Sequence, residues 1–83
     1  MKIEAVQSKM ARVALGLTGK QLAEMAGVSL DTINRLEAGE ELKPRTVAAI
    51  RAALEAAGVI FVDENGEGPG VRLRKGGTSR VLT

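Results

Sequence analysis

The sequence predicts a mainly α protein of 83 residues, with four helices followed by a C-terminal β-hairpin. Apolar residues recur every three or four positions up to residue 58, and capping residues, glycines and a proline divide that region into four segments. Residues 59–62 are apolar, residues 71–74 alternate apolar with basic, and the stretch DENGEGPG between them is turn-like. We therefore divide the chain into a helical domain at residues 1–58, a hairpin at residues 59–75 and a flexible basic tail at residues 76–83.

The first predicted helix rests on a single apolar stripe. Its members lie three or four residues apart, which places them on one face of a helix ending near Gly16: Ile3, Val6, Met10, Val13 and Leu17. This helix precedes two shorter ones.

The second and third predicted helices have clear boundaries. Thr18 and Gln21 have capping-box spacing, in which the hydroxyl accepts from the backbone of Gln21 and the Gln21 side chain reaches back. Gly27 suits the left-handed conformation that ends a helix, and Ser29 can cap the next one, which runs to about residue 38. The inward stripe of the second helix is Leu22, Ala23 and Ala26.

The fourth predicted helix begins at Pro44, a residue suited to the first helical position. Gly58 closes it, and its apolar positions keep the helical spacing: Val47, Ile50, Leu54 and Ala57.

The predicted hairpin has two possible roles. Its apolar face covers the helical core of one chain, or an exposed strand edge pairs with a second copy. We favour the dimer, because 83 residues leave little other surface for association. Either of two faces of the hairpin could supply the dimerisation residues. One face would carry Ile60, Val62, Val71 and Leu73, and the other would carry Val59 and Phe61.

Composition argues against an enzyme. The chain has no cysteine and no histidine, so thiolate chemistry, the commonest general base and the commonest metal ligand are all missing. We therefore predict no catalytic site, no metal site and no cofactor. No apolar run approaches the roughly 20 residues of a membrane helix, and the N-terminus lacks the apolar core of a signal peptide, which predicts a cytoplasmic protein without membrane contact.

The charge pattern is weakly basic. Formal net charge is +2 and the sequence pI is about 9.4. From residue 71 onward there are four basic residues and no acid: Arg72, Arg74, Lys75 and Arg80. Such a tail favours a polyanionic partner, although a solvated end explains the charge equally well.

The second and third predicted helices carry the pattern of a helix-turn-helix. Ala23 is small where the two helices would meet, and Gly27 makes the turn. The Val28 side chain would pack from the turn into the core, while Ile33 and Leu36 anchor the second helix of the motif. The order of sizes matters, because a bulky residue at Ala23 or a Cβ at Gly27 would force the helices apart.

Residues 8–57, which include LAEMAGVSLDTINRLEAG and PRTVAAIRAAL, resemble the Cro and phage-repressor family of helix-turn-helix regulators, also called the XRE family. The resemblance implies a four-helix, lambda-repressor-like helix-turn-helix domain, which the predicted C-terminal β-hairpin follows in this chain. In that family the second motif helix enters the DNA major groove and presents its N-terminal side chains to base edges. The varied outer face of residues 29–38 is thereby implied to read DNA.

The resemblance implies specific contacts. Leu30, Asp31 and Arg35, with Asn34 as an addition, match base-contacting positions. Arg35 suits guanine, Asp31 suits cytosine and Leu30 suits a thymine methyl group. Without the motif all four would be interpreted as ordinary exposed side chains. The positions implied to contact phosphate are Gly19, Lys20, Ser29, Thr32, Lys43 and Arg45.

Three further features concern the same region. Gly19 stands where many relatives have a glutamine, so only a backbone N–H remains there for phosphate. The loop before the fourth helix carries Glu40 and Glu41, where relatives often have bases. The resemblance also implies that Arg12 pairs with Glu37 and holds the third helix against the first, so both residues are interpreted as structural.

The sequence therefore predicts a sequence-specific DNA-binding transcriptional regulator, a small dimeric repressor that binds an inverted-repeat operator through residues 29–38. The alternative is an antitoxin or protein-interaction module on the same fold with weak or no DNA binding. The small net charge, Gly19 and the two glutamates favour that alternative. The predicted partners are double-stranded operator DNA, a second copy of the chain, and a cognate toxin or antagonist protein.

Overall fold

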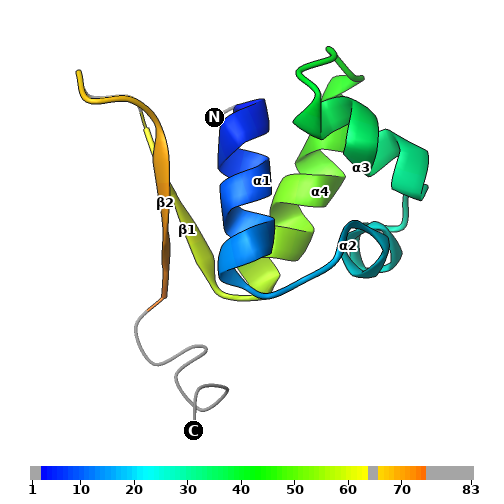
Figure 1. The fold of residues 1–83 in the computed structure, drawn as a ribbon, viewed down its shortest axis with the longest axis horizontal. Coiled ribbons are helices and arrows are strands. Elements are labelled where there is room, and N and C mark those ends of the chain that lie inside the picture. The colour runs from blue at the N-terminus through cyan, green and yellow to red at the C-terminus, as the bar shows by residue number, and fades with distance from the viewer. Residues whose placement is uncertain (1–2, 64–65, 75–83) are drawn as a thin grey trace, which may run out of the picture.

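The computed structural model describes residues 3–63 and 66–74. It contains the predicted four helices followed by an antiparallel hairpin (Figure 1): α1 (Ala5–Ala14), α2 (Gly19–Ala26), α3 (Leu30–Glu37), α4 (Pro44–Ala56), β1 (Val59–Val62) and β2 (Gly70–Leu73). The fold class predicted from the sequence is confirmed. The tail predicted at residues 76–83, together with Lys75, lies outside the described residues.

The predicted helix boundaries are confirmed by their capping contacts. The Gln21 backbone N–H donates to Thr18 Oγ1 over 3.1 Å, and the Thr18 N–H donates to Gln21 Oε1 over 2.8 Å. Ser29 Oγ accepts from the Thr32 backbone N–H over 3.1 Å, and Pro44 occupies the first turn of α4. These contacts satisfy backbone donors that the first turn of a helix leaves without partners.

The core lies between the four helices and continues under β1. In Figure 1 α1 and α4 occupy the middle of the molecule, with α2 and α3 on one side and the hairpin on the other. The largest fully buried apolar side chains of the core are Leu22, Ile33, Ile50, Leu54 and Val59. Burial of each stabilises the fold by about 2 kcal/mol. Packing therefore holds α2 and α3, which at eight residues each are too short to be stable alone.

The apolar stripe predicted for the first helix is not its buried face. The helix forms, but Val6, Met10 and Val13 are 54%, 41% and 60% exposed, and Ile3 is buried ahead of its first turn. The positions of α1 that enter the core are Gln7, Ser8 and Ala11. Ala11 is small enough to bring the helix backbone close to the core, and Gln7 makes contacts that a pattern based on hydrophobicity does not detect.

Gln7 fastens the hairpin to the helices. Its side chain is 1% exposed, and its Nε2 donates to the carbonyl oxygens of Val62 and Gly70, each over 3.1 Å. Its Oε1 accepts from the backbone N–H of Glu4 over 2.8 Å. One buried amide thus joins the start of α1 to both strands.

The strand register corrects the predicted grouping of hairpin side chains. Val71 pairs with Phe61 and Leu73 pairs with Val59. Directly paired residues of an antiparallel ladder share a face, so these four residues lie together. The prediction that grouped Val71 and Leu73 with Ile60 is therefore wrong. Val59 and Phe61 are buried in the core of their own chain, whereas Ile60 is 39% exposed.

Candidate nucleic-acid interface

The turn between α2 and α3 holds the two helices in a fixed relation. Gly27 has a φ of 73°. Glycine adopts this left-handed conformation readily because it lacks a Cβ. The Val28 backbone N–H then donates to the Ala23 carbonyl over 3.0 Å, which closes the turn. Behind α3, Ile33 and Leu36 are 0% and 5% exposed. The inner face of α3 is therefore buried along its length.

The outer face of α3 points away from the core. Leu30 is 44% exposed, and Asp31, Asn34 and Arg35 are also exposed. The four residues predicted to contact bases thus lie on the surface of one short helix. A helix with one buried face and one polar exposed face has the form needed to enter a major groove.

The six residues predicted to contact phosphate lie at the N-termini of three helices. Gly19 and Lys20 begin α2, Ser29 and Thr32 begin α3, and Lys43 and Arg45 begin α4. The starts of α2 and α3 touch, because a Cβ on Gly19 would lie 3.0 Å from Leu30 Cδ1. On the other side, Thr32, Arg35, Lys43 and Thr46 line one hollow between α3 and α4. The helix N-termini carry partial positive charge, which suits phosphate.

Gly19 lies in close contact with Leu30. A Cβ at position 19 would lie 3.0 Å from the Leu30 methyl group, closer than ordinary van der Waals contact. A larger residue there would therefore require the exposed Leu30 side chain to shift by a few tenths of an ångström.

Arg12 and Glu37 form a two-pronged ion pair. Arg12 Nε donates to Glu37 Oε2 over 2.7 Å, and Nη2 donates to Oε1 over 3.1 Å. Arg12 Nη1 also donates to the Leu17 carbonyl over 2.9 Å. The hydrogen bonds that Arg12 donates to Glu37 raise the pKa of Arg12, partial burial opposes this increase, and the negative charge of Glu37 adds a smaller increase. The pair connects α1, the loop after it and the end of α3.

Arg35 also has an acidic partner, which the sequence does not indicate. Its Nε donates to Glu40 Oε1 over 3.0 Å, and both side chains remain about half exposed. The hydrogen bond with Glu40 and then the charge of Glu40 raise the pKa of Arg35, with a smaller contribution from Asp31. An arginine predicted to read bases is therefore held from the loop that follows its helix.

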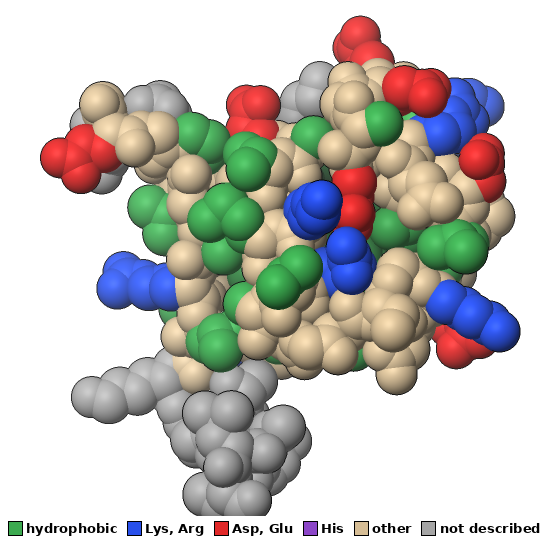
Figure 2. Space-filling view, in the orientation of Figure 1, with side chains coloured by type: hydrophobic (Ala, Val, Ile, Leu, Met, Phe, Trp, Pro, Cys, Tyr) green, Lys and Arg blue, Asp and Glu red, His purple; other side chains and the backbone are tan. Residues whose placement is uncertain are grey.

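Charges of both signs surround α3. Figure 2 shows lysine, arginine and acidic side chains interspersed around α2, α3 and the loop before α4. The basic side chains there include Lys20, Arg35, Lys43 and Arg45, and the acidic ones include Asp31, Glu40 and Glu41. The two signs are nearly balanced among these side chains, so the long-range field of this face is weak.

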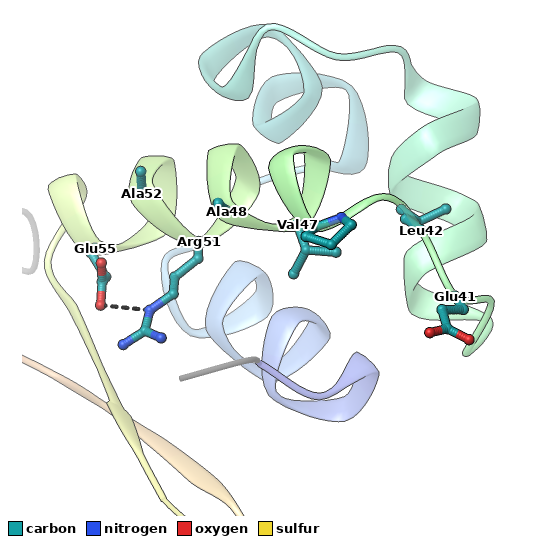
Figure 3. A pocket seen from close by; sticks show the side chains of 8 residues that line it. Glu41, Leu42, Val47, Ala48, Arg51, Ala52 and Glu55 are labelled. Carbon is teal, nitrogen blue, oxygen red and sulfur yellow. Dashed lines mark hydrogen bonds and ion pairs between the residues drawn. The ribbon is translucent and has the colours of Figure 1, made fainter.

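A second hollow runs along α4 (Figure 3). It has a volume of about 430 Å³, and much of its lining is apolar, from Pro44, Val47, Ala48 and Ala52. Arg51 and Glu55 line one end and bond each other over 3.0 Å, and the Arg51 guanidinium lies 5.6 Å from the centroid of the Phe61 ring. Because these charges engage neighbouring side chains, the hollow has the character of an apolar groove.

Sequence reasoning missed Gln7 and the pairing of Glu40 with Arg35. Gln7 follows Glu4 by three residues, a spacing that signals a capping contact and could have drawn attention to it. For Glu40 there is no such signal, because it lies five residues after Arg35 and beyond the end of the helix.

Two specific features are absent from the part of the chain that the structure describes. In residues 3–63 and 66–74, no three histidine, cysteine or acidic side chains are grouped to hold a metal ion. No helix in the same ranges has both the length and the apolar character needed to span a bilayer.

Comparison with known proteins identifies the family. No curated protein sequence matches the chain. The helix-turn-helix family profile matches residues 9–57, which is more than half of the chain and includes all of α2, α3 and α4. The chain belongs to the helix-turn-helix family of DNA-binding regulators, of the XRE type.

Proposed function

We propose that the chain is a sequence-specific regulator that inserts α3 into the DNA major groove. The observation that carries this proposal is that α3 is buried along one face and exposes Leu30, Asp31, Asn34 and Arg35 on the other. A rigidly supported helix can present side chains to base edges with a fixed register. Lys20, Lys43 and Arg45, with the N-termini of α2 and α4, then hold the phosphates on either side and set the orientation.

Each reading residue has a matching base. Arg35 can donate two parallel hydrogen bonds to guanine O6 and N7, and Asn34 can bond adenine. Asp31 accepts from the amino group of cytosine, and Leu30 packs against a thymine methyl group. Ser29 caps α3 through the Thr32 N–H and bonds the Thr32 hydroxyl over 2.8 Å, so this pair faces phosphate as a preformed polar unit.

The test is selection of bound duplexes from a random pool, followed by the Arg35→Ala variant. We expect a selected inverted repeat, and we expect Arg35→Ala to lose preference at one guanine per half-site. Discrimination there should fall roughly tenfold to a hundredfold, because a bidentate contact is removed. Titration of matched duplexes by fluorescence anisotropy measures the change at fixed salt.

The control is Arg45→Ala, which removes the same charge at a position proposed to contact only phosphate. It should weaken binding to all duplexes by similar factors and leave the selected sequence unchanged. If Arg35→Ala selects the same sequence as the unmodified chain, Arg35 does not read a base.

We further propose that the regulator is a homodimer and represses by occupancy, because one motif reads too few base pairs for a unique site. The proposed contact surface is the exposed stripe of α1, namely Val6, Met10 and Val13, together with Val71 of β2. These four residues line one shallow hollow, and Figure 2 shows hydrophobic side chains gathered over α1 and the hairpin. A contiguous apolar surface on a small protein marks an interaction site.

Helix spacing supports a self-complementary contact. Val6, Met10 and Val13 follow one another at intervals of four and three residues, so they form one row along α1. Two such rows that pack antiparallel across a twofold axis place Met10 opposite its own copy, and Val6 opposite Val13. Beside this row, β2 is an edge strand of a two-stranded sheet and can also face the second copy. Of the hairpin residues predicted to dimerise, Val59 and Phe61 are buried in the core of their own chain, so the proposed surface does not include their side chains.

The dimer is tested by Met10→Glu, which places two carboxylates near the proposed axis. We expect the dimer dissociation constant to rise at least tenfold, or about 1.4 kcal/mol, because charge enters an apolar contact. Sedimentation equilibrium measures the mass. A matched control is Met25→Glu, since Met25 is also a helical methionine with similar exposure, 46% against 41%, and lies outside this hollow.

Equal masses for Met10→Glu and the unmodified chain would contradict the proposed surface. The exposed α1 stripe also supports the alternative function, a protein-interaction module with a toxin or antagonist as partner. In that case the unmodified chain would be monomeric and would select no DNA sequence. Retained selection with a monomeric mass would keep the DNA-binding role and remove only the dimer.

A further inference from the structure

The side chain of Arg35 is held by an acid from outside its own helix. Arg35 lies near the end of α3, and Glu40 follows the turn at Gly39, which has a φ of 91°. The Arg35 Nε and Glu40 Oε1 are 3.0 Å apart. The turn that ends α3 therefore brings a carboxylate back alongside the arginine proposed to read guanine.

The nitrogen that Glu40 engages is informative. A guanidinium group is planar and carries five N–H donors, of which Nε supplies one and the two terminal nitrogens supply four. A carboxylate on Nε fixes the plane of the group from the loop side. The terminal nitrogens are the donors suited to the paired acceptors O6 and N7 of guanine.

The surroundings of Arg35 make such a restraint consequential. A hollow of about 320 Å³ lies beside it, between α3 and the start of α4, and it is lined by Thr32, Lys43 and Thr46 among others. A long side chain next to open space has many rotamers, and ordering it on binding costs free energy. The bond to Glu40 would restrict those rotamers before DNA binds.

The charge of Glu40 would also affect binding to unrelated sequences. A carboxylate near the phosphate backbone repels it whatever the bases are, and this weakens non-specific attachment. At the correct site, the oriented guanidinium compensates through its contacts with guanine. Glu40 would therefore strengthen binding to the correct site and weaken binding to unrelated DNA.

We propose that Glu40 is a positioning residue that sets specificity: it holds the Arg35 guanidinium ready for guanine O6 and N7, and its charge suppresses binding to unrelated DNA. This rests on the proposed function, in which Arg35 faces the major groove. Glu41, its neighbour, provides the contrast, because it carries the same charge in the same loop and lines the same hollow, while the bond to Arg35 Nε is made by Glu40.

The experiment compares Glu40→Gln with Glu41→Gln on three duplexes. These are the duplex selected by the unmodified chain, the same duplex with adenine in place of the guanine assigned to Arg35, and an unrelated duplex. Both variants should bind the unrelated duplex more tightly, by a similar factor, because each removes one negative charge. Only Glu40→Gln should lower the guanine-to-adenine affinity ratio, by about threefold or more.

A second measurement separates positioning from general charge effects. In an Arg35→Ala background, Glu40→Gln should no longer change the guanine-to-adenine ratio, because the residue that it positions is absent. Equal ratios for Glu40→Gln and Glu41→Gln in the unmodified background would overturn the proposal. A persistent effect of Glu40→Gln without Arg35 would overturn it as well.

Failure of the proposed function gives a different result. If the unmodified chain selects no sequence from the random pool, then the reading role of α3 is wrong, and so is the positioning of Arg35. If it selects a sequence whose guanine depends on Arg35, while the two glutamine variants behave alike, only the assignment of Glu40 is wrong.

Discussion

Glu37→Ala should destabilise the fold by about 3 kcal/mol, since it leaves the Arg12 guanidinium without its carboxylate. The side chains of Arg12 and Glu37 are only 18% and 13% exposed, so water replaces the lost partner poorly. The expected cost lies at the low end of that for a fully buried pair because neither residue is completely enclosed. In a domain of this size the melting temperature would fall by roughly 12–24 °C. Thermal unfolding followed by circular dichroism measures it.

A control for Glu37→Ala is Glu40→Ala, which removes one carboxylate from a pair whose members are 48% and 52% exposed. The exposed pair is screened by water, and its removal should change the melting temperature by less than about 5 °C. Similar shifts for the two variants would show that the Arg12 pair does not hold α3 against α1. A larger fall in melting temperature for Glu37→Ala than for Glu40→Ala would identify the Arg12–Glu37 pair as the main polar support of the motif.

Gln7→Glu should be similarly disruptive, by about 3 kcal/mol, although it preserves the size of the side chain. The replacement keeps an oxygen that can accept from the Glu4 N–H, but it removes the amide that donates to Val62 and Gly70. A buried carboxylate would then face two carbonyl oxygens without a donor between them. Chemical denaturation measures the free energy, and hydrogen exchange of β1 and β2 should show the hairpin opening first.

Gln21→Glu is the matched control, because Gln21 occupies the same position of the capping box at the start of α2 and is exposed. The carboxylate can still accept from the Thr18 N–H, and water solvates it, so the change in stability should stay within about 0.5 kcal/mol. A hairpin that remains protected from exchange in Gln7→Glu would contradict the role assigned to Gln7. It would leave the contacts of Val59 and Phe61 as the attachment of the hairpin.

Local features of the fold could be predicted from the sequence because they depend on residues close together in the chain. Thr18 and Gln21 cap α2 whatever surrounds them, Gly27 permits the left-handed turn, and Pro44 starts α4. The exposed character of Leu30, Asp31 and Arg35 also follows from helical spacing once Ile33 and Leu36 are placed inside. The family resemblance supplied the roles of these residues, since spacing alone does not distinguish a reading face from a solvated one.

Three features required the tertiary structure, because each joins residues from separate elements. Burial of Gln7 depends on the hairpin, which docks beside α1 and supplies carbonyl acceptors for the amide. The faces of the hairpin depend on strand register, and a turn of undetermined length leaves that register open. The bond from Glu40 to Arg35 depends on the direction of the chain after α3. The sequence by itself determined which segments are helical and where the motif lies. Only the packing decided which polar groups are held in place, because hydrogen bonds across the fold require positions that no local pattern encodes.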